Sequence, residues 1–104
     1  MEQIVEAIAT IDQHTKGYTL DRFADDKKTF DATLMQFVNI GEMVNNLSKD
    51  FREKHRGLPW HQPVGMRNEI AHGYFEIEKE VVWQTVKKDL PKLKKQVEKI
   101  LKNL

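Results

Sequence analysis

Three side chains that could act together in one reaction lie within residues 65–74, namely Arg67, His72 and Tyr74. A guanidinium stays charged at every relevant pH and can bind a phosphate through two parallel hydrogen bonds. An imidazole exchanges protons near neutral pH, and a well-placed one typically accelerates a proton transfer by about 10²–10⁴-fold. RNA supplies its own nucleophile, the 2′-hydroxyl. The stretch therefore indicates phosphodiester chemistry that requires neither a metal nor a covalent enzyme intermediate.

Arg67 is unusual because it falls among apolar positions. At about 100° per residue, a helix over residues 60–71 would place Arg67 in the middle of an apolar arc. The members of that arc are Trp60, Val64, Met66, Ile70 and Ala71. Since burying an unpaired guanidinium is costly, we expect Arg67 to have a fixed anionic partner or to lie at a cleft or subunit interface.

Each of the three residues also has a purely structural interpretation. Arg67 could be an arginine at the edge of the core, paired with Glu42 or Asp50. His72 could stabilise the C-terminal end of a helix through the helix dipole. Tyr74 could be a packing aromatic whose hydroxyl meets water. Periodicity alone does not choose between these interpretations and the catalytic one.

Proton transfer during RNA cleavage is best served by two groups, a base for the 2′-hydroxyl and an acid for the leaving 5′-oxygen. Only His72 is placed beside Arg67. A two-fold dimer that brings two copies of the stretch together would supply two arginines and two histidines around one phosphate. The catalytic interpretation therefore predicts a homodimer.

Nothing in the sequence indicates a metal or another cofactor. The chain has no cysteine, which excludes disulfides and thiolate metal sites. His14, His55 and His61 are expected at helix ends or in loops, and the spacing of the last two fits no zinc pattern. Seventeen Lys and Arg residues nearly balance sixteen Asp and Glu residues, so overall charge does not identify a nucleic-acid binder.

Neither a membrane span nor a signal peptide is expected. No apolar run approaches the ~18 residues that a span requires, and the chain does not begin with a basic and then an apolar segment. We therefore expect a cytoplasmic protein without a membrane partner.

The elements that position these residues are expected to be helices. High charged content with few Gly and Pro residues favours one all-α domain over residues 1–104, a bundle of four to five helices. Apolar spacing predicts helices over residues 2–15 and 28–47, with a short helix capped by Thr19 between them. The second long helix should be central, with Gly41 permitting close approach of a neighbour. Glu42, at the edge of its apolar face, could line the same cleft as Arg67.

The second half of the chain continues the helical pattern. A short helix should follow Ser48, a helix opened at residues 58–60 should carry the candidate site to Gly73, and residues 74–77 should form an extended connector. Residues 78–104 should form a last helix, kinked or restarted at Pro91. Its apolar stripe is predicted to reach Leu104, opposite a face rich in lysine.

The pattern Arg67-Asn68-x-x-x-His72-x-Tyr74 resembles the R-x-x-x-x-H-x-Y motif of HepT-like toxins, in the HEPN superfamily of ribonucleases. The resemblance spans nearly the whole chain and implies a helical HEPN bundle that dimerises with its motifs facing one another across a cleft. It also implies metal-independent RNA cleavage, with Arg67 and His72 catalytic and Asn68 the polar residue after the arginine. The flanking matches are Asn39-Ile40-Gly41-Glu42, Leu58-Pro59-Trp60, Val64-Gly65-Met66, Gly73-Tyr74-Phe75 and Val82-Trp83-x-x-Val86-x-x-Asp89-Leu90-Pro91-x-Leu93.

HepT-like toxins are typically paired with a neighbouring MntA-like minimal nucleotidyltransferase, which acts as the antitoxin in a type VII-like system. The motif tyrosine is the acceptor of adenylyl groups, so the resemblance implies O-AMP-tyrosine at Tyr74. An added AMP would place bulk and negative charge beside Arg67, where an RNA phosphate is expected to bind.

Two function classes remain open. The first is a ribonuclease toxin, and the second is a non-catalytic accessory or substrate-binding subunit of a nucleotidyltransferase. Arg67, His72 and Tyr74 together favour the enzyme, because a binding subunit has no chemical need for the imidazole.

Overall fold

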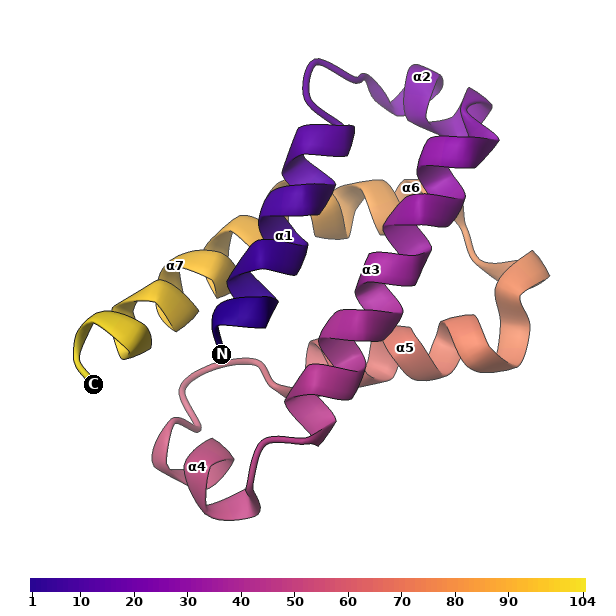
Figure 1. Ribbon diagram of the computed structural model, residues 1–104. Coiled ribbons are helices and arrows are strands. Elements are labelled where there is room, and N and C mark those ends of the chain that lie inside the picture. The colour runs from indigo at the N-terminus through magenta and orange to yellow at the C-terminus, as the bar shows by residue number, and fades with distance from the viewer.

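The computed structural model describes all residues from Met1 to Leu104, and the chain is helical with no strand, as predicted. Two short non-α turns interrupt the helices: the 3₁₀ turn η1 (Tyr74–Glu76) and the π-helical turn η2 (Thr85–Asp89). Figure 1 shows the arrangement. The helices are α1 (Glu2–His14), α2 (Leu20–Asp25), α3 (Lys27–Asn45), α4 (Lys49–Lys54), α5 (His61–Gly73), α6 (Lys79–Gln84) and α7 (Leu90–Lys102).

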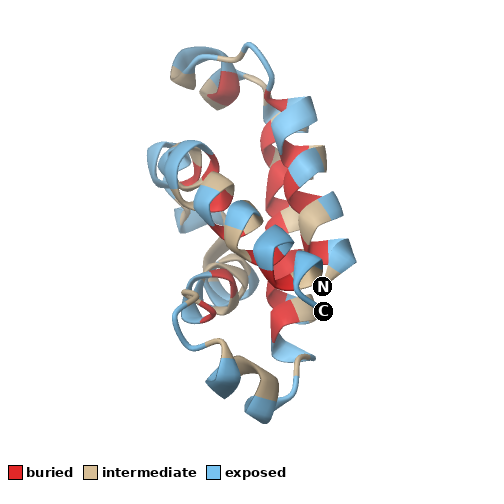
Figure 2. Cartoon of the chain, turned by 90° about the vertical axis from the view of Figure 1, so that its left-hand side faces the viewer, coloured by how far each residue is buried: buried red, intermediate tan, exposed pale blue.

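The long helices form two layers. Helices α1 and α3 lie side by side in one layer, and α5 and the α6–α7 segment cross behind them in the other (Figures 1 and 2). The buried residues face the space between the layers (Figure 2). One hydrophobic core therefore joins both halves of the chain, and it includes Ile8, Phe23, Phe37, Ile40, Val86 and Val97.

Side-chain caps fix where three of the helices begin. The Thr19 hydroxyl accepts a hydrogen bond from the backbone N–H of Arg22, as its predicted role as an N-cap requires. Asp26 caps α3 and Ser48 caps α4 in the same manner. These bonds satisfy N–H groups that have no partner within the helix.

Helix α3 is the central helix, and Gly41 is the point where α5 comes closest to it. A Cβ atom on Gly41 would lie 2.5 Å from the Arg67 Cβ and 2.8 Å from the Pro63 carbonyl oxygen. No larger side chain fits without moving one of the two helices. The predicted close approach at Gly41 is thus confirmed, and its neighbour is the helix that carries Arg67.

The C-terminal segment from α6 to α7 runs without a loop, as expected. The helix passes through the π-helical turn η2, and Pro91, which has no N–H to donate to the preceding turn, follows at the start of α7. The predicted stripe is buried from Val82 to Ile100. Its extension to Leu104 is wrong, because that residue lies past the end of α7 and is 83% exposed.

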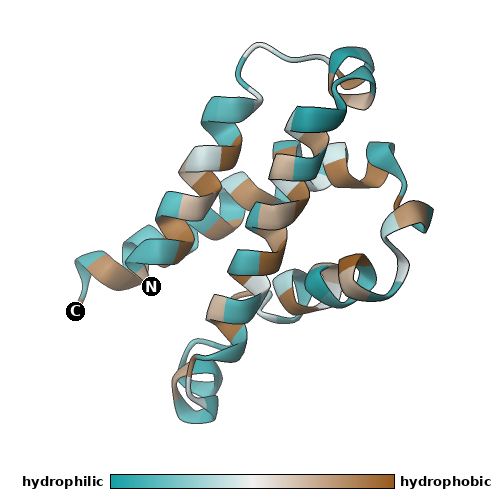
Figure 3. Cartoon of the chain, turned by 45° about the vertical axis from the view of Figure 1, so that its right-hand side comes forward, coloured by the Kyte–Doolittle hydropathy of each residue, from teal (hydrophilic) through white to brown (hydrophobic).

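The extended connector expected at residues 74–77 is also wrong. Gly73 ends α5, and Tyr74, Phe75 and Glu76 form the 3₁₀ turn η1, closed by the Ile77 N–H donating to the Tyr74 carbonyl oxygen. Figure 3 shows apolar residues mainly on inward faces, but also in this turn at the edge of the fold. There Phe75 is 96% exposed. None of the helices is long and apolar enough to cross a membrane.

Candidate functional site

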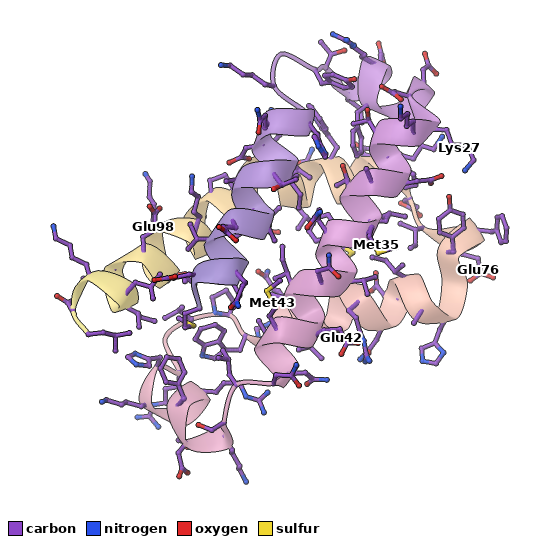
Figure 4. The ribbon with its side chains drawn as sticks, viewed as in Figure 1. Lys27, Met35, Glu42, Met43, Glu76 and Glu98 are labelled. Atoms are coloured by element: carbon purple, nitrogen blue, oxygen red, sulfur yellow. The ribbon has the colours of Figure 1, made fainter.

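Arg67 lies in a half-buried position where α5 crosses α3, with 31% of its side chain exposed. Its Nε donates a 2.8 Å hydrogen bond to Glu42 Oε1, and its Nη2 lies 2.6 Å from the same oxygen. Its Nη1 donates to Asn68 Oδ1 at 2.9 Å. Figure 4 shows Glu42 on the part of α3 that passes α5. The expected anionic partner is therefore present, and it is Glu42 rather than Asp50.

The contacts of Arg67 fix its guanidinium without using all of its donors. A guanidinium carries five N–H groups, and the contacts to Glu42 and Asn68 leave a second N–H on each terminal nitrogen. Because 31% of the Arg67 side chain and 48% of the Glu42 side chain are exposed to solvent, which screens the charges, the ion pair contributes at most about 1 kcal/mol to stability. Its larger consequence is orientation: Arg67 is held in place with donors left for a further anion.

A basic hollow opens beside Arg67, between α4 and α5. Its charged lining is Lys49, Arg52, Arg56 and one carboxylate, Glu53, and it also includes Asn68, which accepts the hydrogen bond from Arg67. The Arg52 Nε is buried and has no hydrogen-bond partner. Sequence reasoning missed these cations, although Lys49 and Arg52 are spaced as on one face of a helix and Arg56 follows just after α4. Positive charge therefore continues from Arg67 onto α4.

His72 lies on a different side of α5 and is exposed. It makes no hydrogen bond or ion pair, and it lines a hollow with Glu69, Glu76 and Glu78. Five positions along a helix correspond to about 140° of rotation between Arg67 and His72. The fold of one chain therefore does not bring the two side chains together: Arg67 faces α3 and is paired with Glu42, whereas His72 faces solvent and carboxylates.

Tyr74 begins η1, and its hydroxyl donates a hydrogen bond to Asp31 on α3. The Nζ of Lys27 pairs with Asp31 and lies 3.4 Å from the Tyr74 hydroxyl oxygen. The hydrogen bond from Lys27, followed by that from Tyr74, lowers the pKa of Asp31 below its usual value. The bond to Asp31 in turn raises the pKa of Lys27. The structural interpretation in which the Tyr74 hydroxyl meets only water is therefore wrong.

Of the other histidines, only His61 lies near this region, where it lines the basic hollow. His14 ends α1, His55 follows α4 with its ring 4.7 Å from that of Phe51, and His61 begins α5. No three His, Asp or Glu side chains converge as metal ligands would. None of these histidines forms a hydrogen bond or ion pair with Arg67.

Comparison with known proteins gives a consistent result. The family described as "Ribonuclease HepT-like" matches residues 4–100. "Probable ribonuclease HepT" of Thermococcus cleftensis is 38% identical over 102 residues, which cover 98% of this chain and 93% of the relative. "Putative RNase TTE0752" of Caldanaerobacter subterraneus subsp. tengcongensis is 37% identical, over 97% of this chain and 90% of the relative.

A third relative is much longer than the region that matches this chain. "Gamma-glutamylcyclotransferase and putative RNase MJ0434" of Methanocaldococcus jannaschii is 38% identical over 100% of this chain but only 47% of its own length. No solved structure matches the chain. The chain belongs to the HepT-like ribonuclease family, as the resemblance of its motif implied.

Proposed function

We propose that this chain, as a single HEPN domain, is a metal-independent endoribonuclease toxin of a type VII-like toxin–antitoxin pair. Arg67 is the observation that carries the proposal, in a chain of the HepT-like ribonuclease family. Glu42 and Asn68 hold its guanidinium while N–H donors remain for a phosphate. The basic hollow beside it, lined by Lys49, Arg52 and Arg56, suits the backbone of an RNA strand.

The active species in this proposal is a homodimer. Arg67 and His72 lie on different sides of α5: the basic hollow lies at Asn68, the bonded neighbour of Arg67, and carboxylates lie around His72. An isologous dimer places the basic side of each chain against the acidic side of the other. The Arg67 of one protomer then meets the His72 of its partner. The opposite charge of the two sides supports this pairing.

The reaction needs only the substrate and these side chains. His72 of one protomer removes the proton of the 2′-hydroxyl, and the resulting oxygen attacks the adjacent phosphorus. Arg67 binds the phosphate oxygens as negative charge accumulates on them. The bond to the 5′-oxygen breaks, and that oxygen takes a proton from the other His72. The products are a 2′,3′-cyclic phosphate and a free 5′-hydroxyl.

In the same proposal Tyr74 is the site at which the toxin is silenced. An MntA-like nucleotidyltransferase transfers AMP to its hydroxyl and forms O-AMP-tyrosine. The added phosphate brings negative charge and the nucleoside brings bulk two residues beyond the proposed catalytic His72, so both oppose substrate binding. The half-buried Tyr74 begins an exposed turn, which supports access by such an enzyme.

The ion pair between Arg67 and Glu42 favours a second candidate function. An arginine already paired with a carboxylate can serve to fasten α5 to α3 without binding any phosphate. The chain would then be a non-catalytic accessory or substrate-binding subunit of the nucleotidyltransferase. The two candidates differ in whether the imidazole of His72 is needed.

The deciding experiment is RNA cleavage by purified wild type, Arg67→Ala and His72→Ala, all in the presence of EDTA. The ribonuclease proposal predicts cleavage by the wild type alone, with 2′,3′-cyclic phosphate ends on the products. An inactive wild type, or a His72→Ala variant that cleaves as fast as the wild type, supports the accessory subunit instead. Growth and RNA integrity in cells that express each variant without a partner give the parallel test in vivo.

A further inference from the structure

The hydrogen bond between Tyr74 and Asp31 joins the turn after α5 to the second turn of α3. We infer that Asp31 is the residue that positions the Tyr74 hydroxyl for nucleotidyl transfer and accepts its proton. The two residues are 43 positions apart in the chain, and the fold brings them into direct contact. This inference rests on the proposed modification of Tyr74 and adds to it the group within this chain that activates the acceptor.

The Asp31 carboxylate is well placed to act as a base. It is 38% exposed, and its partners are Lys27 and Tyr74 alone. An aspartate that accepts the proton of an attacking hydroxyl is an established device in phosphoryl transfer. Asp31, whose pKa is lowered by its bonds to Lys27 and Tyr74, is ionised at neutral pH and accepts the hydrogen bond that aligns the phenol.

The chain contains a matched comparison, because its only other tyrosine is also bonded to an aspartate. The Tyr18 hydroxyl donates a 2.7 Å hydrogen bond to Asp26. Asp26, however, is the N-cap of α3 and also accepts bonds from the backbone N–H and the hydroxyl of Thr29. The Asp26 carboxylate is therefore occupied by hydrogen bonds that begin α3, whereas Asp31 caps no helix.

Lys27 gives the Tyr74 pair a second feature that Tyr18 lacks. Its ammonium group lies 3.4 Å from the Tyr74 oxygen, where an incoming phosphate must approach. Figure 4 shows Lys27 extending from the start of α3 on the side of the fold where η1 and Glu76 lie. Arg22, by contrast, stacks on the face of the Tyr18 ring, with its guanidinium carbon 4.0 Å from the ring centre. A cation at the hydroxyl offsets the charge of the transferred phosphate.

The proposed step is a direct displacement at phosphorus. The Tyr74 oxygen attacks the α-phosphorus of a nucleoside triphosphate, the bond to the bridging oxygen breaks, and pyrophosphate leaves with its electron pair. The phenolic proton passes to Asp31 and then to water. The product is a tyrosyl phosphodiester with one negative charge beside Lys27, and Tyr74 no longer has a hydrogen to donate to Asp31.

The first test needs no partner enzyme. N-acetylimidazole, a small reagent that acetylates phenols, is applied near neutral pH, and peptide mass spectrometry follows Tyr74 and Tyr18 separately. We expect Tyr74 to react faster than Tyr18 in the wild type and to lose that advantage in Asp31→Asn. Asp26→Asn is the matched control and should leave the rate at Tyr74 unchanged. Far-ultraviolet circular dichroism confirms that each variant is folded.

The second test uses a purified MntA-like nucleotidyltransferase with radiolabelled ATP. We expect Asp31→Asn to lower the rate of Tyr74 labelling by about 10²-fold or more, as loss of a general base does. The deficit should shrink as the pH rises, because ionised phenol needs no base. Lys27→Met should raise the KM for ATP or slow labelling, whereas Asp26→Asn should behave as the wild type.

The outcomes separate the role of Asp31 from the proposed modification. If wild-type Tyr74 is not labelled at all, the proposed modification is wrong, and the acetylation experiment still decides whether Asp31 activates the phenol. If the wild type is labelled and Asp31→Asn is labelled equally fast at every pH, the role of Asp31 is wrong and the modification stands. Equal acetylation of Tyr74 in the wild type and in Asp31→Asn contradicts the inference in the same way.

Discussion

The two sides of α5 differ in packing and in charge. On the side of Arg67 the helix touches the α3 backbone at Gly41, and the guanidinium is held by Glu42 and Asn68 next to the cations of α4. On the side of His72 the imidazole is exposed, unbonded and surrounded by carboxylates. In the proposed reaction, one chain therefore supplies the phosphate-binding half of the site on its own. The proton-transfer half depends on a second surface to complete it.

The largest effect is expected at His72. His72→Ala should lower RNA cleavage by about 10²–10⁴-fold, since a general acid–base group is lost. The melting temperature should stay close to that of the wild type, because the exposed side chain has no bond to lose. A labelled RNA oligonucleotide and thermal denaturation measure the two quantities. His14→Ala, at another exposed helix end, should change neither.

The next effect tests the side of α5 that carries Arg67. Gly41→Ala should lower the free energy of unfolding by about 1–3 kcal/mol, the usual cost of overpacking. The two helices must move apart, because the new methyl group would overlap the Arg67 Cβ and the Pro63 carbonyl oxygen. Urea denaturation measures the change. Gly65→Ala is the matched control on α5: nothing lies within 4 Å of its Cβ position, so a gain of up to about 1 kcal/mol is expected. Equal stability of the two variants would contradict the close approach.

A smaller effect is expected in the basic hollow. Replacing Arg52 and Arg56 with Gln should weaken RNA binding several-fold. The logarithm of affinity should also depend less steeply on the logarithm of salt concentration, by about one unit for each phosphate that the variant no longer binds. Filter binding with catalytically inactive His72→Ala protein measures this. The same replacements at Lys95 and Lys99 on α7 test whether the lysine-rich face contributes, and a greater loss of affinity there would place the RNA elsewhere.

The smallest effect concerns acid stability on the side of Tyr74. The pKa of Asp26 is lowered to about 2, mainly by the hydrogen bond from Tyr18, and that of Asp31 is lowered mainly by Lys27. A carboxylate with a lowered pKa stabilises the fold above its ordinary value of 3.8 and loses that contribution as the pH falls through its folded-state value.

Melting temperatures between about pH 2 and pH 6 measure this dependence. Asp31→Asn and Asp26→Asn should each flatten the decline toward low pH. Asp12→Asn, at an exposed position on α1 without a bonded partner, should follow the wild type. A wild-type curve retained in both Asp26→Asn and Asp31→Asn would show that neither carboxylate links stability to pH.

The fold was largely predictable from the sequence because its helices are long and their apolar spacing is regular. Periodicity predicted α1, α3 and the stripe from Val82 to Ile100, and capping preference predicted the role of Thr19. Periodicity failed at η1, because three residues are too few to show a repeat of apolar positions. It also failed at Leu104, because such a repeat does not show where a helix ends. The position of Arg67 in the middle of an apolar arc correctly indicated that the guanidinium needed a partner.

The site was predictable only in its residue types. Glu42 lies 25 positions from Arg67 and Asp31 lies 43 from Tyr74, so these pairs depend on how α3, α5 and η1 pack. The sequence offered two acidic candidates for Arg67 and none for Tyr74. The cations of α4 were missed because the longer lysine pattern of α7 was more conspicuous, although Lys49, Arg52 and Arg56 share one side of the hollow.

The central claim is that Arg67 of one protomer acts with His72 of its partner, and mixing two inactive variants tests it directly. Arg67→Ala and His72→Ala proteins are unfolded together in equal amounts, refolded and assayed for RNA cleavage. Half of the dimers are then mixed, and each mixed dimer keeps one Arg67 and one His72 that face each other across the interface, so cleavage should rise above that of either variant alone while staying below the wild type, which has both histidines. No recovery, with mixed dimers present by native mass spectrometry, would contradict the composite site.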